Sequence, residues 1–358
     1  MLHLQILTQH KTLNGFNDRH PEFSKVDLPM KAASLPSFLV AGLLLCTAAQ
    51  AGAGTLSATD ILSQFNAVIF GSLTSSSEIE GRTFVGGNLS GSSSTYATRT
   101  LPASDYAALT VGGSITTSGW VNVNNSGSAV VAGNVSYMNM NGGSATIGGT
   151  VTGIVNGSAV TGVSLPIPDF KQTLLDFSAQ LATMSANSAV TISGNTAIFS
   201  ASPDADGTAV FTISDLDFFN NINQISFNLN GADTVIINVD VVTATIAANF
   251  LAGAATQIAD NVIWNFADAT ELSFNTEFGG TVLAPNAHVS NSISIDGTLV
   301  ADSLTQNGEL HQYNFTGSIP SDPATPVSVD APSTLALSGL AACALLGAAR
   351  RRRPRLAA

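Results

Sequence analysis

The sequence has 358 residues, of which 10% are charged, and a formal net charge of −12 at pH 7. Between residues 52 and 330, three basic residues stand against 21 acidic ones, a net charge of −18, which excludes nucleic acid as a partner because its phosphates would be repelled. Both cysteines, Cys46 and Cys343, lie outside that segment, so it contains no disulfide, thiolate metal site or thiol nucleophile.

The N-terminal part of the chain predicts export. Met30 and Lys31 precede an apolar run at residues 38–46, and a basic start before a short apolar core is typical of a secretory signal peptide. Residues 1–29 are polar and match no part of such a peptide, which indicates an upstream extension and a translation start at Met30. A lipoprotein signal ending at Cys46 is the alternative, although bulky leucines precede that cysteine.

A small-x-small cleavage site follows at Ala49 and Ala51. The signal peptide is therefore predicted to span residues 30–51, with the mature chain beginning at Gly52. The domain that follows is predicted to cover residues 55–316.

The first half of this domain contains an imperfect repeat. A five-residue pattern of apolar, small, Gly, polar and apolar residues begins at Val85, Val111, Val131 and Ile147, at spacings of 26, 20 and 16 residues. Repeats of this kind are typical of a solenoid, in which each coil offers a short strand, turns on glycine and stacks on the next coil. The predicted fold is mainly β, an irregular β-solenoid; a glycine-rich β-sandwich is the alternative.

One segment changes from strand to helix periodicity. Its apolar residues are spaced by four, three, four and three positions, the pattern of one buried helical face, and are Phe170, Leu174, Phe177, Leu181 and Met184. An acid at residue 169 suits the positive end of the helix dipole. We predict a helix at about residues 168–186 that packs along the flank of the β body.

Strand patterns resume after this helix. Residues 225–229 alternate apolar and polar side chains, and a turn leads into residues 235–239, which predicts a hairpin-like pair. Further on, residues 280–284 (GTVLA) are echoed seventeen positions later by residues 297–301 (GTLVA). We expect these two strands to stack one coil apart, with Ile293 and Ile295 pointing inward and the neighbouring serines outward.

Four aspartates form the best candidate for a metal site. Asp204 and Asp206 alternate before Gly207, as at the opening of a calcium loop, and Asp215 and Asp217 follow shortly after. The twelfth loop position, normally Glu, is the shorter Asp215, so an ordinary acidic turn is the alternative. Calcium is the one cofactor that the sequence suggests.

The C-terminal part of the chain predicts a membrane segment. A Pro/Ser-rich linker at residues 317–332 precedes an uncharged stretch at residues 333–349, whose length is at the lower end of the range that spans a bilayer as a helix. A cluster of arginines follows, which would stay on the cytoplasmic side, and contains Arg350, Arg351, Arg352 and Arg353. A buried core helix is the alternative.

The order of Asp330, Ala331 and Pro332, the apolar stretch and the arginine cluster resembles the PEP-CTERM sorting tail, here at residues 333–355 with its motif just before. In place of the usual Pro-Glu-Pro the chain has residues 329–332, Val-Asp-Ala-Pro. The resemblance implies insertion of the precursor into the inner membrane of a Gram-negative bacterium. It also implies an exosortase-type sorting enzyme as a partner, and delivery to the cell surface or extracellular matrix.

Six parts of the body carry a second resemblance: residues 65–71, 80–82 with 85–88, 261–266, 280–285, 297–304 and 308–311. In these segments the body resembles the choice-of-anchor A domain of exported bacterial proteins. The resemblance implies a surface protein with an adhesive role and without catalytic residues to carry over.

Catalysis is not predicted. A glycosidase needs two facing carboxylates, and no motif pairs them here. No Gly-x-Ser-x-Gly segment accompanies the two histidines of the body, His288 and His311, although Glu309 could pair with His311. We therefore predict a structural or adhesive module that binds extracellular polysaccharide or matrix through outward Ser, Thr and Asn side chains.

Two alternatives remain, a carbohydrate-active β-helix enzyme and an ice-binding protein. Some ice-binding proteins combine a β-solenoid with a flanking helix and present Thr-x-Thr ladders. The Thr-Ala-Thr segment at residues 243–245 stands nearly alone in the sequence.

Overall fold

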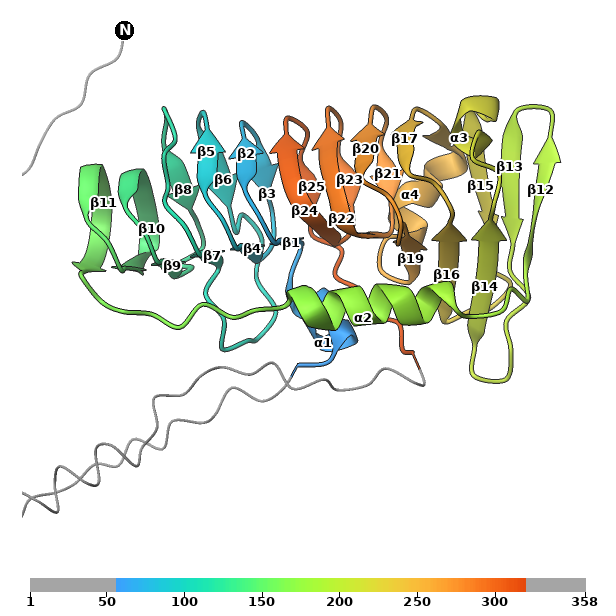
Figure 1. The fold of residues 1–358 in the computed structure, drawn as a ribbon, viewed down its shortest axis with the longest axis horizontal. Helices are drawn as coiled ribbons and strands as arrows, with labels where there is room; N and C mark the ends of the chain where they lie inside the picture. The colour runs from blue at the N-terminus through green and yellow to red at the C-terminus, as the bar shows by residue number, and fades with distance from the viewer. Residues whose placement is uncertain (1–55, 320–358) are drawn as a thin grey trace, which may run out of the picture. The chain divides into compact units, whose positions relative to one another are not determined.

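The computed structural model describes residues 56–319 (Figure 1). These residues form a β-solenoid, in which a 21-stranded sheet is built by parallel pairing between coils. The prediction of a β-solenoid is confirmed, and the β-sandwich alternative is wrong. The predicted signal peptide, the sorting tail and most of the linker lie outside the described residues.

The elements follow one another in three groups. The first group contains α1 (Ala58–Gln64), β1 (Ala67–Ile69), β2 (Leu73–Ser75), β3 (Glu78–Ile79), β4 (Thr83–Val85), β5 (Leu89–Gly91), β6 (Ser94–Tyr96), β7 (Leu109–Val111), β8 (Val121–Val123), β9 (Ala129–Val131), β10 (Val135–Ile147) and β11 (Val151–Thr161). The second contains α2 (Lys171–Ala182), β12 (Ala189–Ser193), β13 (Thr196–Ser200), β14 (Thr208–Ile213), α3 (Phe218–Asn221), β15 (Gln224–Asn228), β16 (Thr234–Val239), β17 (Thr243–Ile246) and β18 (Asn249–Phe250). The third contains η1 (Leu251–Gly253), α4 (Ala254–Ile258), β19 (Val262–Asn265), β20 (Glu271–Phe274), β21 (Phe278–Gly279), β22 (Thr281–Asn291), β23 (Ile295–Asp296), β24 (Leu299–Gln306) and β25 (Leu310–His311).

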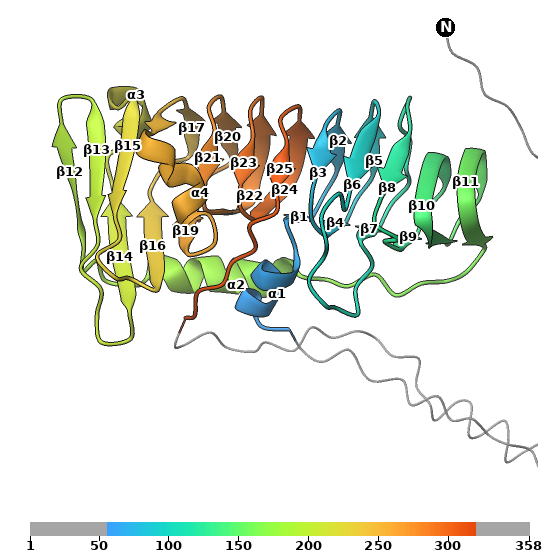
Figure 2. The same ribbon diagram turned by 180° about the vertical axis from the view of Figure 1, so that it is seen from behind.

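The chain enters the solenoid in its middle. β1 pairs in parallel with β4 on one side and with β24 on the other, so that Val68 lies between Phe84 and Val300. From β1 the coils proceed to β11 at one end; residues 162–170 and α2 then lead along the flank to the opposite end, where β12 begins (Figures 1 and 2). The remaining coils return to the middle, and the last coil stacks on the first.

Each coil has three sides, which we name by what they carry. The helix face contains β1, β4, β7, β9, β14, β16 and β19, the first halves of β22 and β24, and the last segments of β10 and β11. The hydroxyl face contains β2, β5, β17 and β20, the bridge residues Ile115 and Val135, and the second halves of β22 and β24. The third face contains β3, β6, β8, β21, β23 and β25 with the middle segments of β10 and β11.

The interior of the solenoid changes along its axis. In the coils between β1 and β11 it is mainly aliphatic, with Leu73 and Leu89 fully buried. In the coils on the β12 side it is aromatic: the rings of Phe199 and Phe227 stack with centroids 4.8 Å apart, and Trp264 meets Phe199 edge-on at 5.4 Å. The indole Nε1 of Trp264 donates a 2.9 Å hydrogen bond to a backbone carbonyl, so the polar atom of this buried side chain is satisfied.

Between β4 and β14, the helix face is apolar on both sides because α1 and α2 cover it. All six residues of β16 are buried, Val235 in the solenoid interior and Ile236 beneath the helices. A strand buried on both sides carries a continuous apolar run rather than alternation. α2 is shorter than the predicted 168–186. Four residues of the predicted stripe are buried as expected, whereas Met184 lies beyond the end of the helix and is only partly buried; the four are Phe170, Leu174, Phe177 and Leu181.

Two buried amides fasten α2 to this face. The Nδ2 of Asn265 donates to the Oδ1 of Asn238 and to the carbonyl of Ser178, both at 2.9 Å, and its Oδ1 accepts from the Ser178 hydroxyl at 2.6 Å. Asn238 in turn donates to the carbonyl of Leu181 at 2.7 Å. These groups are satisfied away from water, which fixes the position of the helix along the solenoid.

One predicted pairing is wrong and another is confirmed. Residues 225–229 and 235–239 form no hairpin: β15 pairs in parallel with β13 and β18, whereas β16 pairs with β14 and β19. The turn between them carries the chain round a corner of the coil, and a corner produces the same sequence pattern as a hairpin. The stacking of residues 280–284 on residues 297–301 is confirmed by the pairing of β22 with β24.

The predicted direction of one side chain is also wrong. Ile295 is fully buried as expected, but Ile293 is 46% exposed. Residues 292–294 lie in the turn between β22 and β23, where the strand alternation that the prediction assumed does not hold.

Candidate functional site

On the hydroxyl face, the outward residue that directly follows the core position of each coil is serine or threonine. The strand registers place these residues opposite one another from coil to coil. We call them the hydroxyl row; from the β12 side to the β11 side it consists of Thr245, Ser273, Ser290, Thr305, Thr74, Ser90, Thr116, Ser136 and Thr152.

Strand geometry explains why the row points outward. Neighbouring side chains in a strand point to opposite faces, so the buried Leu89 turns Ser90 outward, and the buried Ile115 does the same for Thr116. Stacked strands lie about 4.8 Å apart, and the hydroxyls repeat at that interval along the solenoid axis.

The sequence holds a signal for part of this row. The five-residue repeat is followed in all four occurrences by a hydroxyl residue, namely Ser90, Thr116, Ser136 and Thr152. The predicted pattern ended one position too early to include it. The remaining five members share no motif, because they become neighbours only through the register of the coils.

The row has spare hydrogen-bonding capacity. The hydroxyls of Ser273 and Ser290 lie 2.6 Å apart, and those of Thr74 and Ser90 lie 3.1 Å apart. Each hydroxyl offers one donor and two acceptor positions, so a single contact leaves further positions for water or a ligand. Thr116, like Thr74, is exposed.

A second polar row lies beside the first, and its side chains form hydrogen bonds between neighbouring coils. The Oδ1 of Asn88 accepts from the backbone N–H of Ser114 at 2.8 Å, and the Ser114 hydroxyl accepts from Asn134 at 3.0 Å. Asn134 accepts from Thr150 at 2.9 Å in the same way. These side chains stabilise the turns between coils, which explains the polar fourth position of the repeat.

On the β12 side, the second row continues with an exposed carboxylate and an exposed imidazole. Glu271 lies beside His288 in the strand register, and the Nδ1 of His288 lies 2.9 Å from the hydroxyl of Ser303. A shallow hollow of about 350 Å³ adjoins this end of the face and is lined by Leu216, Phe219, Asn220, Thr243, Ala244, Thr245, Glu271 and Ser273. The hydroxyl face therefore combines a long polar row with one depression at its end.

Comparison with known families identifies this kind of domain. Residues 58–312, nearly all of the described solenoid, match a family described as Putative Ice-binding-like adhesive domain. The chain belongs to this family. No curated protein and no solved structure gave a significant match to it. Membership in the adhesive family supports a surface adhesive or structural role.

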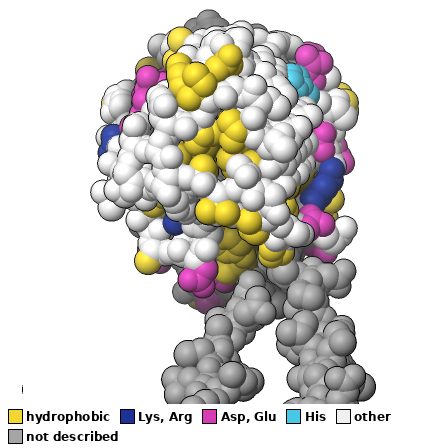
Figure 3. Space-filling model, turned by 90° about the vertical axis from the view of Figure 1, so that its left-hand side faces the viewer, with side chains coloured by type: hydrophobic (Ala, Val, Ile, Leu, Met, Phe, Trp, Pro, Cys, Tyr) yellow, Lys and Arg dark blue, Asp and Glu magenta, His cyan; other side chains and the backbone are white. Residues whose placement is uncertain are grey.

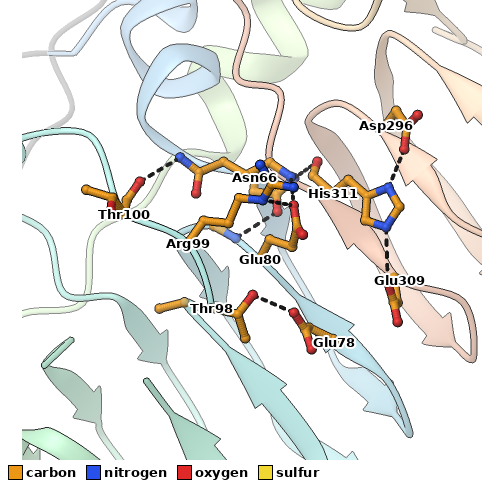
Figure 4. A network of polar contacts seen from close by, with 12 residues as sticks. Asn66, Glu78, Glu80, Thr98, Arg99, Thr100, Asp296, Glu309 and His311 are labelled. Carbon is orange, nitrogen blue, oxygen red and sulfur yellow. Dashed lines mark hydrogen bonds and ion pairs between the residues drawn. The ribbon is translucent and has the colours of Figure 1, made fainter. Parts of the chain in front are cut away.

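The adhesive domain has a cluster of charged groups on its third face, where the first and last coils meet (Figure 4). The Nδ1 of His311 lies 2.5 Å from the Oδ1 of the buried Asp296, and its Nε2 lies 3.0 Å from Glu309. In the first coil, Glu80 forms an ion pair with Arg99 at 2.9 Å. The pairing of Glu309 with His311 is present as the sequence suggested, but the contact with Asp296 was not predicted.

This cluster shifts the protonation of two groups. Burial acts to lower the pKa of His311, but hydrogen bonds to Glu309 and Asp296 and the negative charges of Asp296 and Glu80 outweigh it and raise that pKa above 6.5. Burial, followed by the charge of Asp296 and a hydrogen bond to it, raises the pKa of Glu277 above 4.5. The Oδ2 of Asp296 is buried and has no hydrogen-bond partner among the described residues.

A buried amide joins the first coil to the last coil. The Nδ2 of Asn66 donates to the carbonyls of Gly297 at 2.7 Å and His311 at 3.0 Å, and its Oδ1 accepts from the N–H of Gly81 at 3.0 Å. Asn66 is fully buried. The amide of Asn66 therefore fastens the first coil to the last, and we call this junction, together with the charged cluster beside it, the seam.

The four aspartates predicted as calcium ligands are divided into two pairs. Asp204 and Asp206 precede β14, whereas Asp215 and Asp217 follow it. The Oδ1 of Asp204 accepts from the N–H of Asp206 at 3.0 Å, and the Oδ1 of Asp215 accepts from Asp217 at 3.0 Å, as in ordinary acidic turns. Within residues 56–319, no group of three or more His, Cys, Asp or Glu side chains is placed to hold a metal ion. Calcium binding stays a prediction.

The predicted membrane segment at residues 333–349 lies outside the described residues. Among the residues that the structure does describe, none of the helices has the length and apolar character needed to cross a bilayer.

Proposed function

We propose that this protein is an exported, non-catalytic surface adhesive that binds extracellular polysaccharide through the hydroxyl row. The observation that carries the proposal is the alignment of nine Ser and Thr hydroxyls on one face of an adhesive-family domain. A polysaccharide also presents repeated hydroxyls, each able to donate and accept hydrogen bonds. Weak contacts repeated along two extended surfaces add to useful avidity without a deep pocket.

The proposed route to the surface rests on the sequence. A signal peptide at residues 30–51 would direct export, and a tail at residues 333–355 that resembles PEP-CTERM would be processed by an exosortase-type enzyme in a Gram-negative envelope. The resemblance of residues 55–316 to the choice-of-anchor A domain supports the same destination. Mass spectrometry of the two ends of the protein from fractionated cells tests this route. An intact arginine cluster in the inner membrane would contradict it.

Binding is tested by co-sedimentation of the purified protein with insoluble matrix polysaccharide from the producing cells. Replacing Thr74 and Thr116 with tyrosine places two bulky rings in the row, and we expect retention to fall at least about tenfold, since a shallow hydrogen-bonding surface tolerates no obstacle. Thr191→Tyr in β12 is the matched control, because Thr191 is exposed but lies outside the row. Equal retention of the double variant and the control would refute the proposal.

The same mixtures test the proposed absence of catalysis. Prolonged incubation with the polysaccharide should release no new reducing ends and no unsaturated sugars. Their release would favour the carbohydrate-active alternative. Repeating the sedimentation with a chelator shows whether a divalent cation such as calcium takes part in binding.

Ice binding is a second candidate, favoured by the regular spacing of the same row. Hydroxyls repeated about every 4.8 Å can hold water molecules in a repeating array. Inhibition of ice recrystallisation that is lost with the same double tyrosine variant and kept by Thr191→Tyr would select this function. Retention on polysaccharide without any effect on ice growth would select the first.

A further inference from the structure

The solenoid ends at β11 with an open strand edge. β11 pairs with β10 along its length, and within residues 56–319 no strand pairs with its other edge. Residues 154–156 of β11 lie on the third face, residues 158–161 lie on the helix face, and Gly157 forms the corner between them with φ +102°. An unpaired coil of this kind is a template for further strand pairing.

The side chains at this end are apolar where solvent would favour polar ones. Ile154 is 52% exposed and Val160 is 58% exposed. Viewed onto this end, apolar side chains gather in the centre and charged ones lie at the rim (Figure 3). The strand register shows that both point outward from the coil, because they align with Tyr137 and Thr146, whereas Val155 and Ala159 align with the buried Met138 and Ala145.

The usual protections of an edge strand are missing from β11. Exposed edges are normally blunted by lysine, proline or other charges, but β11 contains none of these, and residues 106–168 include no Asp, Glu, Lys, Arg or His at all. Two identical bodies that each carry a net charge of −18 between residues 52 and 330 can approach each other most easily at such an uncharged end.

We propose that a second copy of this chain docks on the β11 end, with the two β11 strands paired antiparallel about a two-fold axis through Gly157. This axis places Ile154 of one copy opposite Val160 of the other, residue 155 opposite residue 159 and residue 156 opposite residue 158. Outward side chains then meet outward ones and inward meet inward, as an antiparallel ladder requires. The contact is isologous and closes as a dimer.

The other end of the solenoid does not fit this coil. β12 has five residues and pairs antiparallel with β13, whereas β11 has eleven and turns a corner between two faces. The edge of β14 at that end is partly occupied, because the N–H groups of Asn187 and Ser188 donate to the carbonyl of Val210. Within residues 56–319, both arms of the corner are matched by a second β11 coil alone. The pairing therefore favours a closed dimer over a head-to-tail fibre.

The same axis brings the two hydroxyl faces to one side. It passes through the corner between the third face and the helix face, so it exchanges these two faces and maps the opposite hydroxyl face onto the same side of the dimer. The hydroxyl row of one copy then continues into that of the other. This last consequence rests on the proposed function, whereas the dimer itself does not.

The dimer is tested by sedimentation equilibrium of the purified protein over a range of concentrations. We expect a monomer–dimer equilibrium, and Ile154→Lys should weaken association at least about tenfold because the charge would be buried without a partner. Ile192→Lys is the matched control, since Ile192 is 50% exposed at the opposite end. A monomer at all concentrations, or a dimer that Ile154→Lys leaves intact, would overturn the proposal.

Two further variants test the register and guard against misfolding. Combining Ile154→Lys with Val160→Asp should restore association, because opposite charges then face each other across the axis, whereas Ile154→Lys with Val160→Lys should not. Unchanged circular dichroism and thermal midpoints show that each variant is folded. Failure of the opposite-charge pair to restore a dimer would refute this register. If the Ile154→Lys variant is monomeric but still binds polysaccharide, the dimer contact and the polysaccharide-binding surface are separate.

Discussion

Asp296 and His311 face each other in adjacent coils, with the Oδ1 of Asp296 2.5 Å from the Nδ1 of His311. Asp296 is fully buried and the ring of His311 is partly exposed. A buried carboxylate needs a partner, because losing hydration without one is costly. When it is protonated, the imidazole of His311 supplies both a charge and a hydrogen bond, and it links the last two coils of the solenoid beside the seam.

This relationship predicts a dependence of stability on pH. The pKa of His311 is raised above 6.5 in the folded protein, so its contribution is complete below 6.5 and is lost as the pH rises through the folded-state pKa. The free energy of unfolding should therefore decrease as the pH is raised above 6.5. We expect less than about 1 kcal/mol, since solvent screens the partly exposed ring. Denaturant titrations at a series of pH values measure it.

The variant His311→Gln should flatten this part of the profile. His288→Gln is the control, because His288 contacts the hydroxyls of Ser303 and Thr305 on a different face. A profile of His311→Gln that still falls as steeply as the wild type would show that another group is responsible.

The buried amide of Asn265 should contribute strongly to stability. Asn265→Ala leaves the Oδ1 of Asn238, the Ser178 hydroxyl and the Ser178 carbonyl without the partners that they have now. Each unsatisfied buried group costs about 1–3 kcal/mol, so we expect a loss of at least about 2 kcal/mol in denaturant unfolding. Asn286→Ala, at an exposed amide with a single 3.1 Å bond, should cost less than about 1 kcal/mol. Equal losses would contradict a fastening role for Asn265.

Two neighbouring threonines should separate binding from stability. Thr116 is an exposed member of the hydroxyl row, whereas Thr117 is buried and donates a 2.8 Å hydrogen bond to the carbonyl of Gly119. Thr116→Val should change the free energy of unfolding by less than about 0.5 kcal/mol, and Thr117→Val should reduce it by about 1 kcal/mol. In the polysaccharide assay the order should reverse. Retention lost only with Thr117→Val would argue against the row as the binding surface.

The glycine at the third position of the repeat should be irreplaceable. A Cβ atom at Gly133 would lie 2.3 Å from the Ser114 hydroxyl oxygen and 2.7 Å from the Gly113 carbonyl oxygen. Gly133→Ala therefore forces two coils apart, and we expect a loss of about 1–3 kcal/mol, as for other overpacked sites. Adding Ser114→Ala should recover only part of this loss, because the backbone oxygen remains. Full recovery in thermal unfolding would mean that the side chain alone sets the requirement.

Local patterns were sufficient to predict the coils and the flanking helix, because both depend on short-range periodicity. The stripe from Phe170 to Leu181 and the glycine repeat each report which side of one element is buried. The hydroxyl row depends instead on which residues of different coils become neighbours. The sequence around Thr245 and the sequence around Ser273 do not show that these two residues lie side by side. The false hairpin at residues 225–239 has the same origin, because a corner and a hairpin share one local pattern.

The candidate site at the seam was less predictable still. Glu309 and His311 are two positions apart, and their contact could be anticipated. Asp296 joins them only because β23 and β25 are neighbours in the solenoid, and Asn66 joins them only because the first coil lies against the last. Contacts of this kind require knowledge of the topology, which no single segment contains.

The position of the first coil also determines how the domain can be assembled. A solenoid whose chain runs from one end to the other can fold coil by coil. In this domain, the buried amide of Asn66 finds its hydrogen-bond partner only when Gly297, 231 positions later, is in place. Ordering so long an intervening loop is slow compared with local pairing. We therefore expect the chain to form two half-solenoids with complementary open edges, joined through residues 162–170, before they pair through β1 and β24. If the halves fold in this way, two separately made fragments divided within residues 162–170 should reassemble when they are mixed.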